Sequence, residues 1–294
     1  LWDAWQREVN PPTTQVTPGA ISDSSNQRHD PLPVPGDGLT SNTESPSIAS
    51  GIEGVSSSIT PNLFTTGEKI KVTTDTVVAE IDTAGGDIRQ LGLLLHPSSE
   101  DKNKPYELLL DKTARFHVAQ SGLIGDKLPS HKTKYTAESN NYELESGQDK
   151  LVVKLLAPEE NGIQVAKIFT FHRNNYVIDV AFEITNQSDE TIIPFSYFQM
   201  LRDANEPSGS NTMIHSYTGP AMYTDADKFI KIKFSDLDKN KAEYPANADN
   251  GWIAMLEHYF LAAWLPTQQA PREYYVKHLA FNQYTAGVIA PVGA

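Results

Sequence analysis

The sequence predicts an all-β fold, either an antiparallel sandwich or a barrel, for the part of the chain after Glu68. Short apolar or alternating runs recur there about every ten residues, with turn residues between them. No convincing amphipathic helix lies between Glu68 and Asn186. The 294 residues suit either two domains of roughly 150 residues or one large all-β domain.

The strongest strand signal lies in residues 176–185, where apolar and polar side chains alternate with a period of two. Residues 163–171 alternate in the same way, and the Asn174-Asn175 pair between the two runs predicts a hairpin turn. The strands expected on this basis are 70–73, 77–81, 88–95, 106–110, 116–119, 151–156, 163–171, 176–185 and 192–201.

Glycines mark two further structural positions. Gly85 and Gly86 supply the positive φ that a tight connection between two strands needs. Gly251 precedes the most apolar run of the chain, which extends from Trp252 through Pro266. This run fits either one helix or two strands around a turn near Glu257-His258, and its terminal aromatics favour the strands. In both cases we expect the run to lie in the core.

The N-terminal part of the chain has a different composition. The chain begins at Leu1 rather than Met, so we expect a fragment or a processed product. Residues 1–9 contain Trp2 and Trp5 beside charges, which fits either the end of a membrane-proximal helix or a frayed, solvated helix end. Residues 10–66 are rich in Pro, Ser and Thr and predict a disordered tether, with a buried Ω-loop as the alternative. If the segment is a tether, removing 10–54 should leave the melting temperature unchanged. The folded domain is expected from 67 to 294.

Charge and composition exclude several classes of function. Lys and Arg total 24 against 37 Asp and Glu, a net charge of −13. Such a surface disfavours sequence-independent nucleic-acid binding and a polybasic membrane clamp. The absence of cysteine excludes disulfides, thiolate metal sites and a cysteine nucleophile. No apolar run approaches the ~18 residues that a transmembrane helix needs.

A search for catalytic chemistry finds no motif. The chain lacks a Gly-x-Ser-x-Gly nucleophile turn and a His-Glu-x-x-His zinc helix. No two of its eight histidines lie within five residues of each other, so no local metal pair exists. We therefore predict no catalytic residue, no cofactor and no metal site.

Several segments, taken together and in order, resemble the large periplasmic domain of the YidC membrane-protein insertases (YidC/Oxa/Alb family) of Gram-negative bacteria. The resemblance spans nearly the whole chain, and each motif alone is weak. The matching segments are Leu-Trp-Asp-Ala-Trp at 1–5, Asp-Thr-Ala-Gly-Gly-Asp-Ile at 82–88, Ala-Gln-Ser-Gly-Leu-Ile-Gly at 119–125, Gly-Pro-Ala at 219–221 with Tyr223, and 251–266 with both tryptophans.

This resemblance implies a twisted, antiparallel two-sheet β-supersandwich similar to galactose mutarotase, with few or no helices. It further implies a domain on the periplasmic side of the bacterial inner membrane, anchored by a transmembrane span outside this chain. The family inserts and folds inner-membrane proteins, alone or with the Sec translocon. The partners implied are SecDF, SecYEG and nascent inner-membrane proteins. The family also continues beyond residue 294 with a strand and a helix, so we expect one exposed sheet edge here.

The function predicted from sequence and resemblance is non-catalytic protein binding. Candidate partner-binding residues are Tyr223, Phe229, Ile232 and Phe234, because aromatics alternate with charges between 223 and 241. The alternative is that these side chains merely cover the core. Two rival functions remain open. One is a mutarotase-like carbohydrate domain using His172, Glu183 or His215, and the other is a purely structural spacer.

Overall fold

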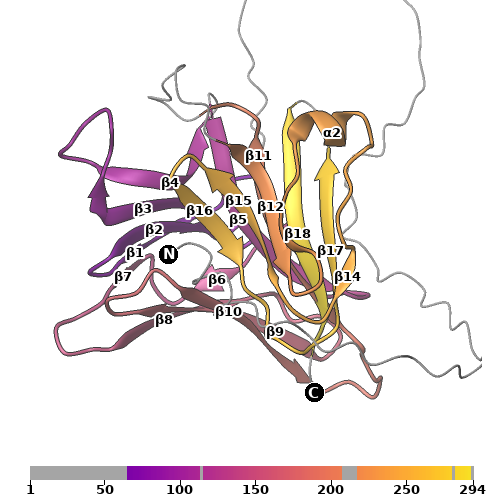
Figure 1. The fold of residues 1–294 in the computed structure, drawn as a ribbon. Coiled ribbons are helices and arrows are strands. Elements are labelled where there is room, and N and C mark those ends of the chain that lie inside the picture. Colours follow the sequence, from indigo (N-terminus) through magenta and orange to yellow (C-terminus); the bar gives the residue numbers. More distant parts are fainter. Residues whose placement is uncertain (1–64, 113–114, 207–216, 280–281, 293–294) are drawn as a thin grey trace, which may run out of the picture. The chain divides into compact units, whose positions relative to one another are not determined.

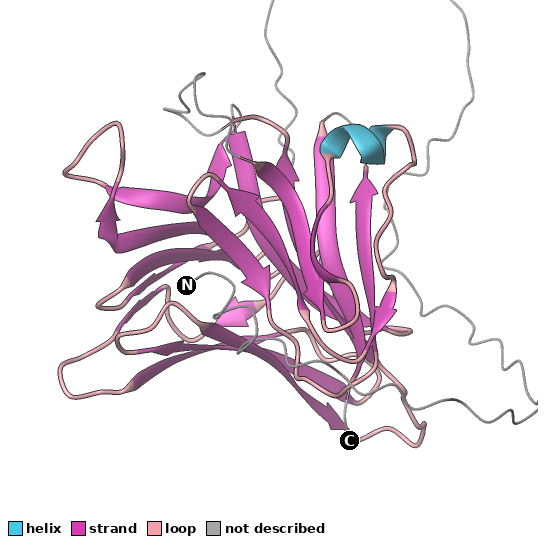
Figure 2. Cartoon of the chain, in the orientation of Figure 1, coloured by secondary structure: helices cyan, strands magenta, loops and turns pink. Residues whose placement is uncertain are grey.

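The computed structural model describes residues 65–112, 115–206, 217–279 and 282–292. The expected helix end at 1–9 and nearly all of the expected tether at 10–66 lie outside these residues, as does the predicted effect of removing 10–54. Almost all regular structure in the described part is β-strand, with the short helix α2 (Phe234–Asp238) as an exception (Figure 2). No helix of the described part is long and apolar enough to cross a membrane.

The largest element is a ten-stranded sheet, which forms one layer of the domain (Figure 1). Its neighbouring strands are antiparallel except for the pair β1 and β7, which is parallel. In spatial order the strands are β14 (Asn247–Ala248), β17 (Arg272–His278), β18 (Gln283–Pro291), β11 (Phe195–Asp203), β5 (Arg115–Ile124), β4 (Pro105–Lys112), β3 (Asp87–Pro97), β2 (Val77–Asp82), β1 (Lys69–Thr73) and β7 (Asn141–Glu143).

Two four-stranded sheets complete the domain. The first has the order β10 (Ile178–Asn186), β9 (Ile163–His172), β8 (Lys150–Leu156) and β6 (Thr136–Ala137). The second has the order β13 (Lys228–Lys231), β12 (Thr218–Thr224), β15 (Trp252–Glu257) and β16 (Phe260–Trp264). The predicted all-β sandwich is therefore confirmed, with a second layer that is divided into two sheets.

The main hydrophobic core joins the three sheets. Val72 and Ile81 of the large sheet, Phe169 of the β8–β10 sheet, and Met222 and Ile253 of the β12–β16 sheet belong to one buried cluster. Burial of this apolar surface, at ~25 cal/mol per Å², is the main contribution that favours folding. The large sheet also carries two smaller buried clusters, one of Phe116, Val118 and Leu201 and one of Tyr197, Tyr275 and Ile289. Because the main cluster is shared by all three sheets, they should fold as one unit.

A buried lysine also ties two of the sheets together. Lys167 of β9 is fully buried, and its Nζ donates to the carbonyl oxygens of Gly85 at 3.1 Å and Ser121 at 3.0 Å in the large sheet. Burial lowers the pKa of Lys167, and the carboxylate of Asp87 acts in the opposite direction. Gly85 (φ 89°) and Gly86 (φ 58°) form the predicted turn between β2 and β3, which places the Gly85 carbonyl at this lysine.

The local predictions can now be compared with the structure. All nine expected strands are present, and β9 and β10 form the predicted hairpin around Asn174, whose φ is 53°. The run after Gly251 folds as two strands, β15 and β16, and its helical alternative is wrong. Within residues 223–241, where aromatics alternate with charges in the sequence, β12 ends and is followed by the exposed strand β13 and the short helix α2.

Candidate functional site

Three aromatic side chains lie next to one another on three neighbouring strands. Tyr223 of β12 pairs directly with Phe229 of β13 on one side and with Trp252 of β15 on the other. The Tyr223 and Trp252 rings are nearly parallel, with centroids 6.2 Å apart, and the Phe229 and Trp252 centroids are 6.0 Å apart. Phe229 is 48% exposed, and the other two are half-buried. We call these three residues the aromatic face.

Gly251 allows β15 to approach β12 closely enough to build this face. Its φ of 94° lies in the left-handed region, and a Cβ atom there would come within 1.9 Å of the Tyr223 carbonyl oxygen. The side chain of Gln268 fixes the glycine backbone, accepting from its N–H at 2.8 Å and donating to its carbonyl at 3.2 Å. A side chain at position 251 would therefore displace the strand that carries Trp252.

Two of the four predicted contact residues are poorly placed to meet a partner. Ile232 is only 3% exposed, because its backbone N–H still bonds to Pro220 and its side chain joins the core. Phe234 begins α2 and is half-buried, with its ring centroid 4.3 Å from that of Tyr284. Ile232 is thus corrected to a core residue, whereas Tyr223 and Phe229 remain candidates.

The two tryptophans predicted for the core are only partly buried. Trp264 packs against the core, with its ring centroid 5.1 Å from that of Phe198. Trp252 lies at the outer end of β15 and packs on Tyr223 and Phe229 instead. The prediction of a core position for Trp252 is therefore wrong, since the residue belongs to the aromatic face.

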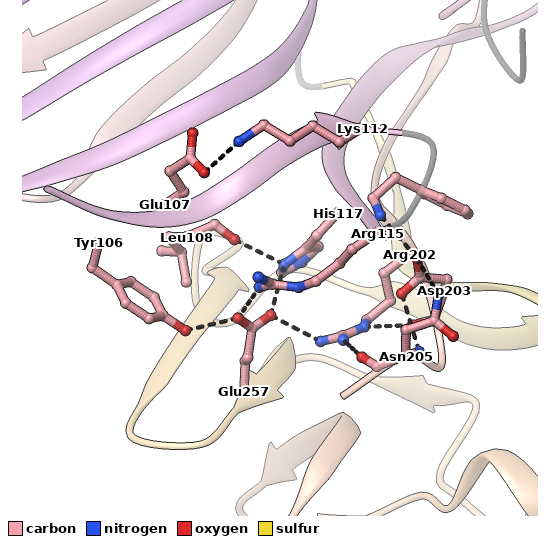
Figure 3. Close-up of polar contacts among 11 residues, drawn as sticks. Tyr106, Glu107, Leu108, Lys112, Arg115, His117, Arg202, Asp203, Asn205 and Glu257 are labelled. Atoms are coloured by element: carbon pink, nitrogen blue, oxygen red, sulfur yellow. Dashed lines mark hydrogen bonds and ion pairs between the residues drawn. The ribbon is translucent and has the colours of Figure 1, made fainter. Parts of the chain in front are cut away.

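The opposite end of β15 carries a buried carboxylate that fixes the strand to the large sheet (Figure 3). Glu257 is fully buried, and its Oε1 accepts from the hydroxyl of Tyr106 at 2.7 Å and from the guanidinium of Arg115. Its Oε2 accepts from Nη1 of Arg202 at 3.2 Å. These partners come from β4, β5 and β11, so one side chain joins four strands.

Arg202 is held by further contacts (Figure 3). Arg202 is fully buried, and it donates from Nε to the Asp203 carbonyl at 2.7 Å and from Nη2 to the Asn205 carbonyl at 3.1 Å. The Asp203 carboxylate accepts from the backbone N–H of Phe116 at 2.9 Å. Burial lowers the pKa of Arg202, while Glu257 and Asp203 oppose that shift. The cluster thus pairs its buried charges, as buried charges require.

His117 lies beside this cluster in the neutral form. Its Nδ1 is 3.1 Å from the Leu108 carbonyl oxygen, an acceptor, so Nδ1 carries the proton. Burial and the positive charges of Arg202 and Arg115 hold the pKa of His117 well below its usual range. Burial, followed by the Glu257 charge, raises the pKa of Tyr106.

This arrangement positions a strand and offers little for catalysis. Glu257 has no exposed surface, and three donors occupy its oxygens, so a substrate could not reach it. Among the residues that the structure describes, no group of three or more His, Cys, Asp or Glu side chains could hold a metal ion. A single acidic residue within an apolar run is the sequence signal that could have revealed Glu257.

The residues proposed for carbohydrate chemistry are not brought together. Glu183 pairs in register with Ala166, six positions along β9 from His172, which separates the two by ~20 Å. His172 instead contacts Asp179 at 2.7 Å, and Glu183 accepts from Lys154 at 2.7 Å. His215 lies outside the described residues. His172 and Glu183 therefore cannot act as a joint acid and base on one sugar.

Comparison with known proteins identifies the family. The model of the YidC periplasmic domain matches residues 69–294. The chain belongs to this family. A relative from Nitrosomonas europaea, which is named membrane protein insertase YidC, is 56% identical to this chain. The alignment covers 100% of this chain and 49% of the relative. The relative of that name in Nitrosospira multiformis is 55% identical, with 100% and 52% aligned. This member of the YidC periplasmic domain family thus spans about half the length of these curated relatives.

Solved structures with a similar chain path are more distant from this YidC periplasmic domain. A galactose mutarotase related enzyme from Lactobacillus acidophilus is 13% identical, with a TM-score of 0.45 over 76% of this chain and 85% of that chain. A putative aldose 1-epimerase from Escherichia coli K12 is 11% identical, with a TM-score of 0.36 over 76% and 88%. Likenesses at these scores carry no argument about what the domain does.

Proposed function

We propose that this chain is a non-catalytic periplasmic domain of a membrane-protein insertase. It assists the insertion and folding of inner-membrane proteins through protein–protein contacts, alone or with the SecDF and SecYEG subunits of the Sec translocon. The family membership of residues 69–294 supports the insertase assignment. The single observation that supports protein contact is the aromatic face, because exposed aromatic clusters are enriched at protein interfaces.

The chemistry around the aromatic face supports a contact with another protein. Lys231 lies 5.9 Å from the Phe229 ring centroid and 5.0 Å from that of Tyr217, so a cation borders the aromatic surface. Asp225 and Asp227 lie in the adjoining turn between β12 and β13. An apolar centre with a charged border is the usual composition of a protein-binding surface.

Site-specific photo-crosslinking of the full-length parent protein in intact membranes tests this function. A photoreactive amino acid is placed singly at Tyr223 or Phe229 of the aromatic face. Phe169, which is 1% exposed, serves as the buried control, and Ile193, which is 80% exposed on the loop between β10 and β11, serves as the exposed control. We expect discrete crosslinks to a Sec subunit or a nascent chain from positions 223 and 229 only.

Other outcomes would contradict the proposal. Equal crosslinking from Ile193 and Phe229 would mean that the aromatic face has no preferred partner. An absence of crosslinks from both face positions, in cells where the insertase is active, would favour a structural spacer. A crosslink from Phe169 would indicate that the domain is unfolded. The crosslinking at positions 223 and 229 must then be repeated with labelled variants whose melting curves match that of the wild type.

A further inference from the structure

Exposed apolar side chains gather at one rim of the domain. The described residues include eleven large apolar side chains that are exposed, and six of them come from three segments: the end of β3, the residues at the start of β10 and the β15–β16 hairpin. We call these six the apolar rim. They are Leu94, Leu95, Tyr176, Val177, Tyr259 and Leu261.

Ring contacts connect the three segments. The His96 ring centroid lies 5.7 Å from that of Tyr176 and 5.5 Å from that of Phe260, and Nε2 of His96 is 3.2 Å from the Tyr176 hydroxyl. Phe260 stacks in turn on Tyr106, with centroids 4.0 Å apart. These contacts bring the three segments together. Leu94 shares a face of β3 with His96, whereas Leu95 and Leu261 lie on the opposite face of their strands from His96 and Phe260.

The rim is uncharged, although the chain as a whole is strongly acidic. Segments 93–97, 175–178 and 258–262 contain no Asp, Glu, Lys or Arg, whereas these residues make up 21% of the sequence. The net charge of −13 repels anionic surfaces from most of the molecule. Within these three segments an apolar phase meets no charged side chain, and charges that are near in the sequence, such as those of the 98–104 loop and Asp179, lie outside them.

The shape and chemistry of the rim favour a lipid surface over a polypeptide partner. Its residues stand at strand ends and at a hairpin tip, where His258 has a φ of 57° and Tyr259 is 78% exposed. Protruding tips need a complementary hollow on a protein, whereas a fluid bilayer adapts to them. Tyr176 and Tyr259 combine an apolar ring with a hydroxyl, which suits the boundary between headgroups and acyl chains.

We propose that the apolar rim docks on the surface of a lipid bilayer, with its side chains entering the boundary between headgroups and acyl chains. This contact goes beyond the transmembrane anchor expected from the sequence and does not depend on the aromatic face binding a partner. Trp252 begins β15 and Tyr259 follows its end, a separation of about 20 Å along the strand direction. Both surfaces can therefore be occupied at once.

Vesicle flotation of the 294-residue chain with phosphatidylcholine vesicles tests the proposal. The rim variant replaces three exposed side chains, L95S, Y259S and L261S. The matched control replaces three exposed side chains elsewhere, I193S, V152S and L265S. We expect the partition coefficient to fall at least about tenfold in the rim variant and to stay unchanged in the control, because three apolar side chains no longer enter the bilayer. Matching melting curves would establish that both variants are folded.

A fluorescent probe distinguishes a rim contact from other modes of binding. The chain has no cysteine, so Tyr259→Cys or Ile193→Cys gives a unique position for an environment-sensitive label. We expect vesicles to shift the label emission to the blue at position 259 and not at 193. Equal binding by the wild type and the rim variant would overturn the proposal, and so would failure of the wild type to float.

Two further results would also contradict lipid docking by the rim. One is binding that requires added phosphatidylglycerol and disappears in high salt, which would be electrostatic. The other is a label at position 259 that responds to an apolar transmembrane peptide and not to vesicles, which would assign the rim to a polypeptide. The proposed function would survive either result, since its test uses positions 223 and 229.

Discussion

At the scale of single residues, Glu257 accounts for how the second layer is fixed to the first. Its carboxylate joins β15 to Tyr106, Arg115 and Arg202, which lie far apart in the sequence. A buried ion pair adds little stability compared with apolar packing, but removing one partner leaves the others charged and desolvated. The cluster therefore acts mainly to specify one position for the strand.

Replacing Glu257 with glutamine should destabilise the fold by ~3–5 kcal/mol, because two buried guanidinium groups lose their counter-charge. Urea titration followed by circular dichroism measures the free energy of unfolding. The matched control is Glu107→Gln, which removes an exposed carboxylate that pairs with Lys112 at 2.6 Å and should cost less than ~1 kcal/mol. Equal losses in both variants would contradict the special role of Glu257.

His131 predicts a dependence of stability on pH. Its Nδ1 contacts the Tyr197 hydroxyl at 2.5 Å, and burial, followed by the charges of Lys132 and Lys167, lowers its pKa from 6.5 to about 4. Between these two pH values the unfolded chain binds a proton at His131 that the folded chain does not. The contribution of His131 to the free energy of unfolding is therefore complete above pH 6.5 and is lost as the pH falls towards 4.

The wild type should therefore lose up to ~3 kcal/mol relative to His131→Asn as the pH falls from 6.5 to 4, since the asparagine does not titrate. Urea titrations of both proteins across this range give the difference, in which the titrations of other groups cancel. A difference that stays constant with pH would mean that His131 protonates as easily in the folded state as in the unfolded chain.

At the scale of the element, the entry of β15 depends on the backbone of Gly251. The same strand begins with a residue of the aromatic face and ends with the buried carboxylate. A displacement at the first residue of β15 is therefore expected to change the aromatic face more than it changes the contacts of Glu257 at the other end.

Gly251→Ala should destabilise the fold by at least ~2 kcal/mol, because it adds a clash with the Tyr223 carbonyl to the strain of positive φ. Gly147→Ala is the matched control, since Gly147 has a similar φ of 87° and no atom within 4 Å of the place that a Cβ would take. Thermal melts of both variants separate clash from strain. Equal shifts in melting temperature would show that the close approach of β12 and β15 is relaxed in solution.

At the scale of the whole molecule, the three sheets share one core and should unfold together. Lys167→Met removes the donor that joins the β8–β10 sheet to Gly85 and Ser121, and should cost at least ~2 kcal/mol by leaving buried acceptors unpaired. Tryptophan fluorescence of a variant in which Trp2 and Trp5 are replaced by phenylalanine reports on Trp252 and Trp264 in the other small sheet. Its urea midpoint should fall together with that from circular dichroism, and separated midpoints would contradict a single cooperative unit.

The class of fold was predictable because one-sided strands carry a period of two. Ile178 to Ile184 shows that pattern, and the hairpin it predicts is present. Strands β17 and β18 escaped prediction because both of their faces are largely buried, as at Ala286, Gly287 and Val288, so apolar and polar residues do not alternate there. The short strands β6, β7 and β14 were also not predicted, because they form only by pairing with strands that are distant in the sequence.

The candidate site was predictable only in part. Tyr223 and Phe229 were found because aromatics near charges suggest an exposed strand, but β13 ends at Lys231, and Ile232 turns into the core. The Glu257 cluster could not be assembled from sequence, since its arginines meet Glu257 only after the large sheet has packed against the sheet that contains β15. Trp252 was assigned to the core because an apolar run does not reveal which of its ends reaches the surface.

The anchoring of β15 at Glu257 also has a mechanical consequence. A partner that pulls on Trp252 along the strand loads the backbone bonds to β12 and β16 in shear, so that many bonds share the force. The edge strand β13 is bonded to β12 alone over four residues, so the same pull on it is shared by fewer bonds. A force applied to the aromatic face would thus meet a stiffer support at Trp252 than at Phe229, although the rings of these two residues are in contact.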